Sequence, residues 1–556
     1  MIELRFISPD NPRFTSTFAA IERELRRGDH MLRYAAEDDF GAPETAFNVC
    51  TFWLIEALHI AGRDAEARAL FETMLGHTTR SGMLSEDLDY ENNELWGNFP
   101  QTYSLNRVAV PKARGAAGAQ GGLAGALNSA LRKHGGVWFG WSGQESEEGA
   151  GGGINTQTHD GVTTATVDLS KRDIDEYYNG YANATLWPLF HYRLDLTEYE
   201  RETGKGYERV NEAFAEAVTP LIEEDDLVWV HDYHLIPLGE RLRSRGITNR
   251  IGFFLHIPWP PTRLFVSLPY HERLVRTMLQ YDLVGFQTQE WLDSFLHYCT
   301  KELGAEVDEA TGSVTLDGRT VTAKAYPIGI DWDHFHAQGD SGESRQAEQR
   351  LLSSTRHRIA MIGVDRLDYS KGLPERIDGI GRFFDQHPER VRDLVYIQVA
   401  PPSREDVESY QQIRALLEQK TGQINGARSE VDVVPIRYVN RGYTHAQLYG
   451  FFRAAKIGLV TPLRDGMNLV AKEYVAAQDP EDPGVLILSR FAGAAHQLED
   501  AVLVNPHSPD DVADAIGRAL DMKIDERRER YEKMVGTVRD DNVQKWTADF
   551  VRDLTG

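Results

Sequence analysis

The feature that most constrains this chain is an alternation of short apolar runs with amphipathic helical stretches, which begins near residue 105 and restarts near residue 358. The first series contains VWFGW (137–141), DLVWV (226–230), RIGFFLHIP (250–258) and YDLVGFQT (281–288). The second contains RIAMIGV (358–364), LVYIQVA (394–400), IGLVTP (457–462) and GVLILS (484–489). Such alternation predicts parallel sheets covered by helices. Two series, separated near residues 331–357, predict two doubly wound domains that face one another.

The alternation also sets the predicted domain plan. Residues 1–104 are expected to be helical, because FNVCTFWLIEALHIAGR (47–63) and DAEARALFETML (64–75) predict two antiparallel helices with a short link. Residues 105–335 and 336–535 are expected to form the two α/β domains, and residues 536–556 a final helix.

The net charge and the number of cysteines limit which binding partners and which cellular compartment are expected. A net charge of −25 disfavours general binding to nucleic acid or to an anionic membrane, so an anionic small substrate would need a local cluster of Arg and Lys. Cys50 and Cys299 can form neither a disulfide framework nor a four-thiolate zinc site. The start, MIELRFISPDNPRF, has charges where a signal peptide needs an apolar run, and no window approaches 18 uninterrupted apolar residues. We expect a cytoplasmic protein; whether it forms a homo-oligomer is left open.

Ligands of doubly wound sheets bind outside the carboxyl ends of the strands, so the residues that follow each apolar run are site candidates. HDYH (231–234) follows the second run and allows three interpretations. These are a metal site at His231 and His234, a hydrogen-bonded loop that caps the next helix, and a carboxylate, Asp232, aimed at a substrate hydroxyl. His256 follows the third run and is held by the prolines of IPWPP (257–261), although a lone histidine in an apolar setting is usually a core residue.

The second series carries the positive charges that a diphosphate would need. Arg366 and Lys371 arrive together in DRLDYSKG (365–372), where the alternative is a surface salt bridge. In LRDGMNLVAKEYVAA (463–477) a helix is expected to start at Asn468, and its free N–H groups suit an anion. Asp465 before this helix could accept from sugar hydroxyls, and Glu473 within it from a ribose diol. The alternative is a capped helix without a ligand.

Three weaker patterns complete the survey. GAQGGLAGAL (118–127) is a glycine-rich loop that enters a helix, which alone is weak support for phosphate binding. The aromatic run YYNGYANATLWP (177–188) would suit stacking on a sugar but is more often core. DID (173–175) and DWD (331–333) match a metal-binding DxD pattern, but neither follows a suitable strand, so no metal site is expected.

A dozen motifs in register resemble one family from about residue 106 to the C-terminus. The sequence there is similar to the trehalose-6-phosphate synthase family, glycosyltransferase family 20. The motifs are NRVAVP, GGLAGAL, VWFGWSG, EYYNGYANATLWPLFHYRLDL, HDYHLIPL, RIGFFLHIPWP, DLVGFQT, YPIGID, DRLDYSKGLPERI, APPSRED, LVTPLRDGMNLVAKEYVAAQ and LSRFAGAA.

The resemblance implies a GT-B fold, in which two Rossmann-like domains enclose the active site in a cleft and the final helix crosses back to the first domain. It implies transfer of glucose from UDP-glucose to glucose 6-phosphate to give trehalose 6-phosphate and UDP. It further implies retention of the anomeric configuration without a metal or cofactor, since UDP-glucose is itself a substrate.

The resemblance also implies roles for individual residues. Those expected to bind the donor are Gly122, His256, Arg366, Lys371, Asp465, Met467, Asn468, Leu469, Val470 and Glu473. Those expected to bind the acceptor sugar phosphate are Arg107, Trp141, Tyr178, Trp187, Asp232 and Arg404. Asp232, His256, Arg366 and Lys371 are expected to be catalytic, with the two cations stabilising the charge on the leaving group.

Residues 1–104 resemble the C-terminal end of a family 15 glycoside hydrolase, part of an (α/α)6 barrel. Glu86 in LSED matches the catalytic base, but the general acid would lie in sequence that this chain lacks. Because hydrolysis needs two carboxylates, no hydrolase activity is expected. The join falls within GNFPQTYSLNRVAVP (97–111), where the family's apolar first strand is missing. Whether Tyr103 and Leu105 pair as a substitute strand that supports Arg107 is left open.

Three other functions stay open on the sequence. One is a related sugar-nucleotide transferase with another phosphorylated acceptor, such as glycerol phosphate. A second is a binding protein whose catalysis is impaired by the N-terminal fusion, and a third is a glycosidase. The nucleotide of the donor, UDP, GDP or ADP, is not decided by the sequence either.

Overall fold

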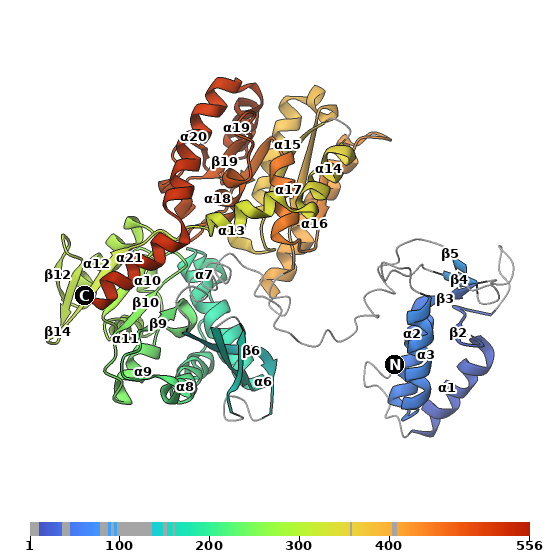
Figure 1. Cartoon of the computed structure of the whole chain (residues 1–556), viewed down its shortest axis with the longest axis horizontal. Coiled ribbons are helices and arrows are strands. Elements are labelled where there is room, and N and C mark those ends of the chain that lie inside the picture. The colour runs from blue at the N-terminus through green and yellow to red at the C-terminus, as the bar shows by residue number, and fades with distance from the viewer. Residues whose placement is uncertain are drawn as a thin grey trace. The chain divides into compact units, whose positions relative to one another are not determined.

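The computed structural model of the chain describes residues 11–35, 45–77, 87–89, 94–96, 136–147, 153–159, 162–355, 358–402 and 408–556. It divides into two compact units, Met1–Gly118 and Ala119–Gly556 (Figure 1). No helix within these described ranges is long and apolar enough to cross a membrane.

The first unit contains helices α1 (Pro12–Leu25), α2 (Asn48–Ile60) and α3 (Asp64–Gly76). Leu54 and Leu58 of α2 pack against Leu70 of α3, as the two antiparallel helices of the sequence analysis require. Short strands also occur, and the expectation of an all-helical segment did not include them. They are β1 (Arg26–Arg27), β2 (His30–Met31), β3 (Ala46–Phe47), β4 (Asp87–Asp89) and β5 (Glu94–Trp96). Strands of two or three residues are too short for an alternation to be read.

The first sheet of the second unit has six strands in the order β12-β13-β14-β11-β10-β9. Strands β9 (Val228–His231), β10 (Ile251–Phe254), β11 (Leu283–Phe286) and β14 (Arg319–Ala325) are parallel, whereas β12 (Glu306–Asp308) and β13 (Ser313–Leu316) extend the edge antiparallel. All residues of β10 and β11 are buried, since helices cover both faces. The helices of this part are α8 (Arg201–Val218), α9 (Leu238–Ser244), α10 (Thr262–Phe265), α11 (His271–Met278) and α12 (Gln289–Glu302).

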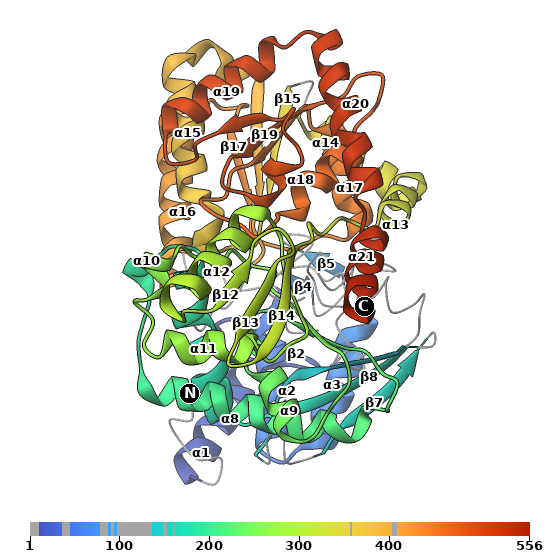
Figure 2. The same ribbon diagram turned by 90° about the vertical axis from the view of Figure 1, so that its left-hand side faces the viewer.

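The second sheet is fully parallel, in the order β17-β16-β15-β18-β19-β20 (Figure 2). Its strands are β15 (Ile359–Val364), β16 (Leu394–Val399), β17 (Ile436–Val439), β18 (Ile457–Val460), β19 (Val485–Ser489) and β20 (Val502–Val504). Its helices are α13 (Trp332–Ala337), α14 (Gly342–Thr355), α15 (Leu373–Gln386), α16 (Glu408–Arg428), α17 (His445–Ala454), α18 (Leu469–Ala476), α19 (Pro509–Asp521) and α20 (Ile524–Asp540). The chain order reverses between β15 and β18, which is the switch point where such sheets bind ligands.

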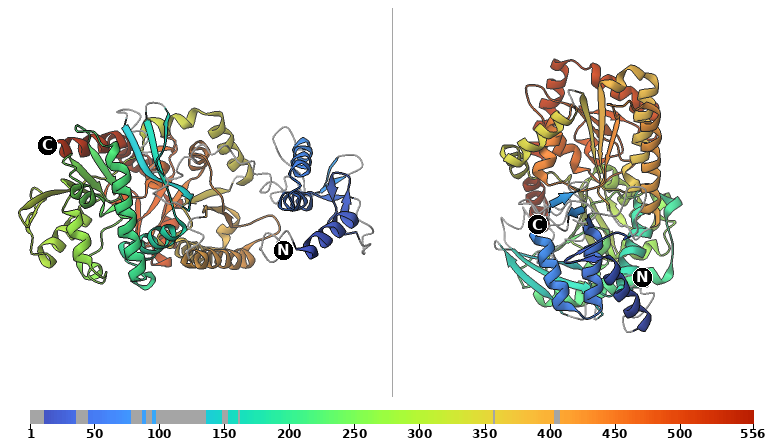
Figure 3. Two further views of the ribbon diagram at one scale, coloured as in Figure 1. Left: turned by 90° about the horizontal axis from the view of Figure 1, so that it is seen from below. Right: turned by 90° about the vertical axis from the view of Figure 1, so that its right-hand side faces the viewer.

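A separate three-stranded sheet, coloured cyan in Figure 3, joins β6 (Gly136–Glu145), β8 (Val162–Leu169) and β7 (Asn155–His159) in that order. It leads into α6 (Lys171–Asp173), the π-helix η2 (Ile174–Leu186) and α7 (Trp187–Phe190). The predicted strand at 137–141 lies toward the start of β6. The aromatic run at 177–188 lies in the π-helix and continues into the start of α7. A π-helix is a rare element that often occurs at functional sites.

The last helix, α21 (Val543–Thr555), packs on the first sheet although it follows helices of the second. The ring of Phe550 lies over Gly252 of β10 and Gly285 of β11, where an added Cβ would come within 2.6 and 2.9 Å of it. The chain thus returns to its first α/β half. The exact domain boundaries at 335 and 535 stay predictions.

Candidate functional site

The carboxyl ends of the two six-stranded sheets meet. His256 follows β10 of the first sheet and Gly466 follows β18 of the second, and a Cβ added to Gly466 would lie 1.8 Å from the His256 carbonyl oxygen. Two arginines from the second half also face aromatic rings of the first. The guanidinium carbon of Arg464 is 3.7 Å from the ring centroid of Tyr192, and that of Arg366 is 5.7 Å from Trp187. Both halves therefore present their ligand-binding edges to one common space.

On the second sheet, the structure brings the predicted donor residues together. Lys371 Nζ lies 2.5 Å from Asp465 Oδ2, and the side-chain amide of Asn468 donates to the same oxygen at 2.9 Å. Asn468 has a left-handed backbone, with φ of 70°, and directly precedes α18. Met467 is buried in the loop, and Leu469 and Val470 begin the helix, where the first N–H groups have no intrahelical partner. A cation and unpaired helix N–H groups thus converge beside Asp465.

A buried ion pair supports this cluster. Arg376 of α15, with a fully buried side chain, lies 2.8 Å from Asp365 Oδ2 and donates at 2.8 Å to Thr461 Oγ1, so it ties the end of β15 to the end of β18. It also donates to the carbonyl of Lys371 at 3.4 Å. The sequence analysis missed Arg376, although the signal was present. This arginine lies within a helix whose buried face carries Leu373, Ile377 and Ile380.

Burial shifts the pKa values of two neighbouring residues of α18, Lys472 and Glu473, in opposite directions. Burial raises the pKa of Glu473 to about 7. Burial lowers the pKa of Lys472 to about 7, and its ammonium donates to the Ile328 carbonyl at 2.7 Å and to Gln497 Oε1 at 2.6 Å. Both groups therefore titrate near neutral pH beside the residues that are predicted to bind the donor.

On the first sheet, Asp232 and His256 come together as neighbouring strand ends. The His256 backbone N–H donates to Asp232 Oδ1 at 3.2 Å. Asp232 has φ of 72°, a strained conformation for a residue other than glycine, and such strain is concentrated at functional sites. His231 contacts His256, whereas the His234 ring stacks on Tyr178, so the two histidines of HDYH point to different partners. Among the described residues, no group of three or more His, Cys, Asp or Glu is arranged to hold a metal ion.

The aromatic residues predicted to bind the acceptor lie in two places. Trp141 of β6 and Tyr178 of η2 have ring centroids 5.1 Å apart and form one cluster with His234. Trp187 of α7 is buried, with its ring centroid 4.1 Å from that of His191 and with Arg366, which is predicted to bind the donor, over its ring. Trp187 therefore connects the predicted acceptor and donor residues.

Several predicted residues lie outside the described ranges. They are Arg107, Gly122 and Arg404 of the predicted site, Glu86 of the hydrolase resemblance, and Tyr103 and Leu105 of the join. Their roles stay predictions, as do the individual roles of the residues placed above.

Gln287 was not predicted as a site residue, and His231 was considered only as a possible metal ligand, yet both contact His256. Gln287 is the first residue after β11 and is 2% exposed. His231 ends β9. The rule that found His256, to look where a strand ends, would have found Gln287 as well.

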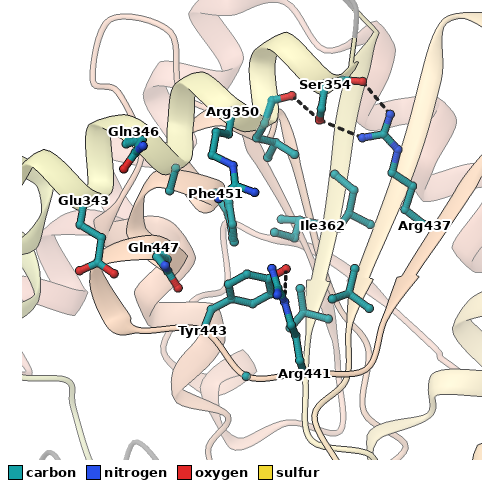
Figure 4. Close-up of a pocket in the computed structure, with 16 residues that line it drawn as sticks. Glu343, Gln346, Arg350, Ser354, Ile362, Arg437, Arg441, Tyr443, Gln447 and Phe451 are labelled. Atoms are coloured by element: carbon teal, nitrogen blue, oxygen red, sulfur yellow. Dashed lines mark hydrogen bonds between the residues drawn. The ribbon is translucent and has the colours of Figure 1, made fainter. Parts of the chain in front are cut away.

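A cavity of about 360 Å³ lies on the same sheet as the donor residues (Figure 4). Its floor is apolar, with Ile362, Ile397 and Val399 from β15 and β16. Arg350 of α14 points into it, and Arg441 lies over the ring of Tyr443 at 4.9 Å. Val399 and Val439 end β16 and β17, so the cavity extends to the same sheet edge as Arg366, which follows the neighbouring strand β15.

Comparison with known proteins gives one consistent result. The sequence model of glycosyltransferase family 20 matches residues 104–556. A trehalose-6-phosphate synthase of Sinorhizobium fredii is 46% identical over 451 residues, which cover 81% of this chain and 97% of the relative.

Solved structures agree in fold. An α,α-trehalose-phosphate synthase (UDP-forming) from Burkholderia xenovorans in complex with glucose 6-phosphate has a TM-score of 0.77 at 46% identity, covering 79% of this chain and 97% of that one. An E. coli structure bound with UDP-2-fluoro glucose has a TM-score of 0.75 at 43% identity, covering 78% and 96%. The predicted GT-B arrangement of two Rossmann-like halves is confirmed. The match starts at residue 104, and these comparisons give no support to a hydrolase origin of residues 1–104.

Proposed function

The chain belongs to glycosyltransferase family 20, and from that premise we infer that it transfers glucose from UDP-glucose to glucose 6-phosphate, giving trehalose 6-phosphate and UDP. The observation that supports this function is that the carboxyl ends of the two sheets meet and carry different kinds of side chains. One edge presents Lys371, Arg366 and the start of α18, which suit a diphosphate. The other presents Asp232 and His256, which suit sugar hydroxyls. Relatives solved with glucose 6-phosphate and with a UDP-glucose analogue support both substrates.

The donor half would act by fixed charge. When the sugar–phosphate bond breaks, negative charge develops on the leaving diphosphate, and Arg366, Lys371 and the N–H groups of Leu469 and Val470 would stabilise it. Lys371 is held by Asp465 in the structure, so the diphosphate would share this ammonium with the carboxylate. Asp465 would then accept from glucose hydroxyls, and Glu473 from the ribose.

We propose retention of the anomeric configuration by attack on the face that the leaving group departs from, with a donor phosphate oxygen helping to remove the acceptor proton. The proposed roles of Asp232 and His256 are to orient the reacting hydroxyl and the donor sugar. Trp141, Tyr178 and Trp187 would contact the acceptor ring, and Arg107 and Arg404 its phosphate. Retention is tested by the anomeric configuration of the product, which NMR couplings report.

The arginine-lined cavity suits the base of the donor nucleotide. It extends to the same strand edge as the residues proposed to bind the diphosphate, and its apolar floor suits a planar ring. Guanidinium groups only donate hydrogen bonds, so Arg350 and Arg441 would favour a base with carbonyl oxygens, such as uracil, over adenine, whose edge carries an amino group. Replacing both arginines by alanine should reduce the preference for UDP-glucose over ADP-glucose. An unchanged preference would place the base elsewhere.

The central experiment measures UDP release from UDP-glucose with and without glucose 6-phosphate. We expect release that depends on the acceptor, and trehalose 6-phosphate as the product. Glycerol phosphate in place of glucose 6-phosphate tests the alternative acceptor. Intact nucleotide binding without acceptor-dependent release would instead identify a binding protein.

For residues 1–104 we propose no hydrolytic role, and the assay is hydrolysis of maltose and trehalose by the full chain. Glucose release from either sugar would contradict this. A cytoplasmic location is also proposed, supported by the sugar-phosphate and nucleotide-sugar substrates and by the presence of only two cysteines, Cys50 and Cys299.

A further inference from the structure

Gln287 connects His256 to the segment that joins the two α/β halves. It is buried at the end of β11, and its Oε1 accepts from the backbone N–H of Ile328 at 3.0 Å. Ile328 belongs to YPIGID (326–331), which leads from β14 of the first sheet to the helices of the second. The other end of the amide, Nε2, lies 3.4 Å from His256 Nδ1.

The backbone N–H of Ile328 fixes the direction of these hydrogen bonds. A backbone N–H can only donate, so the oxygen of the Gln287 amide has to face it, and the NH₂ group then faces His256. An amide NH₂ group also only donates. His256 Nδ1 must therefore accept, which leaves it without a proton.

The second ring nitrogen of His256 follows from the first. Burial holds the pKa of His256 well below its usual value and lowers that of His231 to about 3, so both rings are neutral at neutral pH. A neutral imidazole whose Nδ1 accepts carries its proton on Nε2. His256 Nε2 lies 3.1 Å from His231 Nδ1, so its N–H donates to His231 in the absence of substrate.

The same Ile328 residue is held from the opposite side by the donor helix. Its carbonyl oxygen accepts from Lys472 Nζ at 2.7 Å, and Lys472 directly precedes Glu473 on α18. Lys472 also donates to Gln497, whose amide donates to Asp541 at 3.0 Å, just before α21. The peptide groups that fix Gln287 are therefore anchored between both halves of the site.

We propose that Gln287 is a positioning residue that holds His256 as the Nε2–H tautomer, so that this imidazole meets the donor sugar as a hydrogen-bond donor. The inference rests on the proposed function for its sugar contact. The sugar oxygen that reaches His256 has to accept, and it replaces His231 as the partner of the Nε2–H.

The first test reads the tautomer directly. In chain labelled with ¹⁵N-histidine, two-bond ¹H–¹⁵N spectra distinguish a protonated from an unprotonated ring nitrogen. The signals of His256 are identified among the 18 histidines by their loss in His256→Gln. We expect a protonated Nε2 and an unprotonated Nδ1 in the unmodified protein. A protonated Nδ1 would overturn the proposal, and this measurement needs no Gln287 variant to fold.

The second test separates positioning from folding. Gln287→Met keeps the side-chain length but neither accepts nor donates, so His256 is expected to populate both tautomers. The affinity for UDP-glucose should fall in proportion to the loss of the Nε2–H tautomer, about twofold if the two tautomers become equally populated, while that for UDP, which lacks the sugar, stays unchanged. Gln478→Met is the matched control, because buried Gln478 likewise accepts from a backbone N–H, that of Gly484 at 2.9 Å, and donates to a carbonyl, that of Phe452 at 2.8 Å. It should leave the tautomer and the ratio of the two affinities unchanged.

The third test concerns the sugar. Two UDP-glucose analogues are compared, in which the hydroxyl that meets His256 is replaced by fluorine or by hydrogen. Fluorine accepts a hydrogen bond weakly and cannot donate one, so the fluoro analogue should bind better than the deoxy analogue. This difference should become smaller in Gln287→Met, where both tautomers are populated, and an undiminished difference there would contradict the proposal. Binding and tautomer are measured without turnover. If transfer to glucose 6-phosphate fails while both behave as expected, the proposed function is wrong and the role of Gln287 stands.

Discussion

At the scale of single residues, burial determines the pH at which two side chains of α18 titrate. Lys472 and Glu473 are neighbours on α18, and both titrate near pH 7, far from their ordinary values. Neither is paired with the other. Lys472 is bound to Ile328 and Gln497, which are neutral groups. Burial therefore disfavours the charged form of each side chain. A ligand that binds to the charged form has to offset the free energy that burial costs.

Glu473→Gln should stabilise the protein above pH 7 and weaken nucleotide binding. The folded pKa of Glu473, about 7, lies above its ordinary value of 4.5, so the native state binds the extra proton between these values. Stability is consequently lost as pH rises through this window. Gln mimics the protonated form, so at pH 8 the free energy of unfolding should exceed that of the unmodified protein by on the order of 3 kcal/mol, with no difference near pH 4.

Urea unfolding at both pH values measures this difference, and the contribution of Lys472 cancels because both proteins contain it. UDP titration gives the second readout: affinity should fall in Glu473→Gln, and in the unmodified protein as pH drops below about 7. Equal stabilities at pH 8 would show that the Glu473 carboxyl is not disfavoured by its burial.

Lys371→Ala and Arg366→Ala should each remove most of the turnover. Loss of one fixed group that stabilises transition-state charge typically reduces kcat about a hundredfold. This corresponds to an activation free energy that is higher by about 3 kcal/mol. Steady-state kinetics with UDP-glucose and glucose 6-phosphate measure it. Lys420→Ala is the control, since Lys420 forms an ion pair with Asp378 at 2.6 Å on α15 and should change neither kinetic constant. Unchanged kinetics in both site variants would mean that the diphosphate binds elsewhere.

At the scale of elements, the loop between β18 and α18 is one of the places where the two α/β halves touch. Gly466 allows this loop to approach the backbone of His256, and the neighbouring Gly493 lies where a Cβ would meet the Gly466 carbonyl oxygen at 2.1 Å. The loop therefore has backbone on two sides and no room for a side chain at its centre. Its position decides where Asp465 and the first turn of α18 stand.

Gly466→Ala should consequently impair both folding and donor binding. Its Cβ would lie 1.8 Å from the His256 carbonyl oxygen, so the loop has to move. Overpacking of this kind lowers stability by about 1–3 kcal/mol, and the displaced Asp465 should weaken UDP-glucose binding at least tenfold. Gly536→Ala, inside α20 with open space around it, should instead stabilise by about 0.5–1 kcal/mol. Calorimetric melting and UDP-glucose titration compare the two variants, and wild-type binding by Gly466→Ala would contradict this account.

At the scale of the whole chain, α21 fastens the end of the protein to its first α/β half. Phe550 is fully buried, and its ring stacks on Trp229 with centroids 4.3 Å apart. Trp546 of the same helix lies 6.0 Å from the His256 ring. The helix thus packs on the first sheet. Its Trp546 also contacts the two histidines of the site, His231 and His256.

Phe550→Ala should lower the free energy of unfolding by about 3–5 kcal/mol, because a large side chain is removed from a packed core. Phe550→Leu should lose less, since it keeps an apolar side chain over Gly252 and Gly285. Urea unfolding gives both values. Equal stabilities of the alanine variant and the unmodified protein would show that α21 is not bound to the first sheet in solution.

The strands most accurately predicted are those buried on both faces. The runs at 358–364 and 484–489 correspond to β15 (Ile359–Val364) and β19 (Val485–Ser489). The edge strand β12 and its neighbour β13 carry no continuous apolar run and were not predicted, because most of their residues are partly exposed. The π-helix η2 was not predicted either, since its residue pattern does not differ enough from that of an α-helix.

The sequence by itself determined the fold class and the strand ends that carry chemistry, because double burial produces apolar runs and parallel strands present their ends at one edge. It thereby predicted Asp232, His256, Arg366, Lys371 and Asp465 as candidate site residues, and their individual roles stay predictions. Only the tertiary structure decided which of these meet, and it added Gln287 and Arg376. Their roles depend on partners such as Ile328 and Asp365 that lie elsewhere in the chain. A hydrogen bond between distant segments has no local sequence pattern, since it forms only when packing brings a donor and an acceptor together.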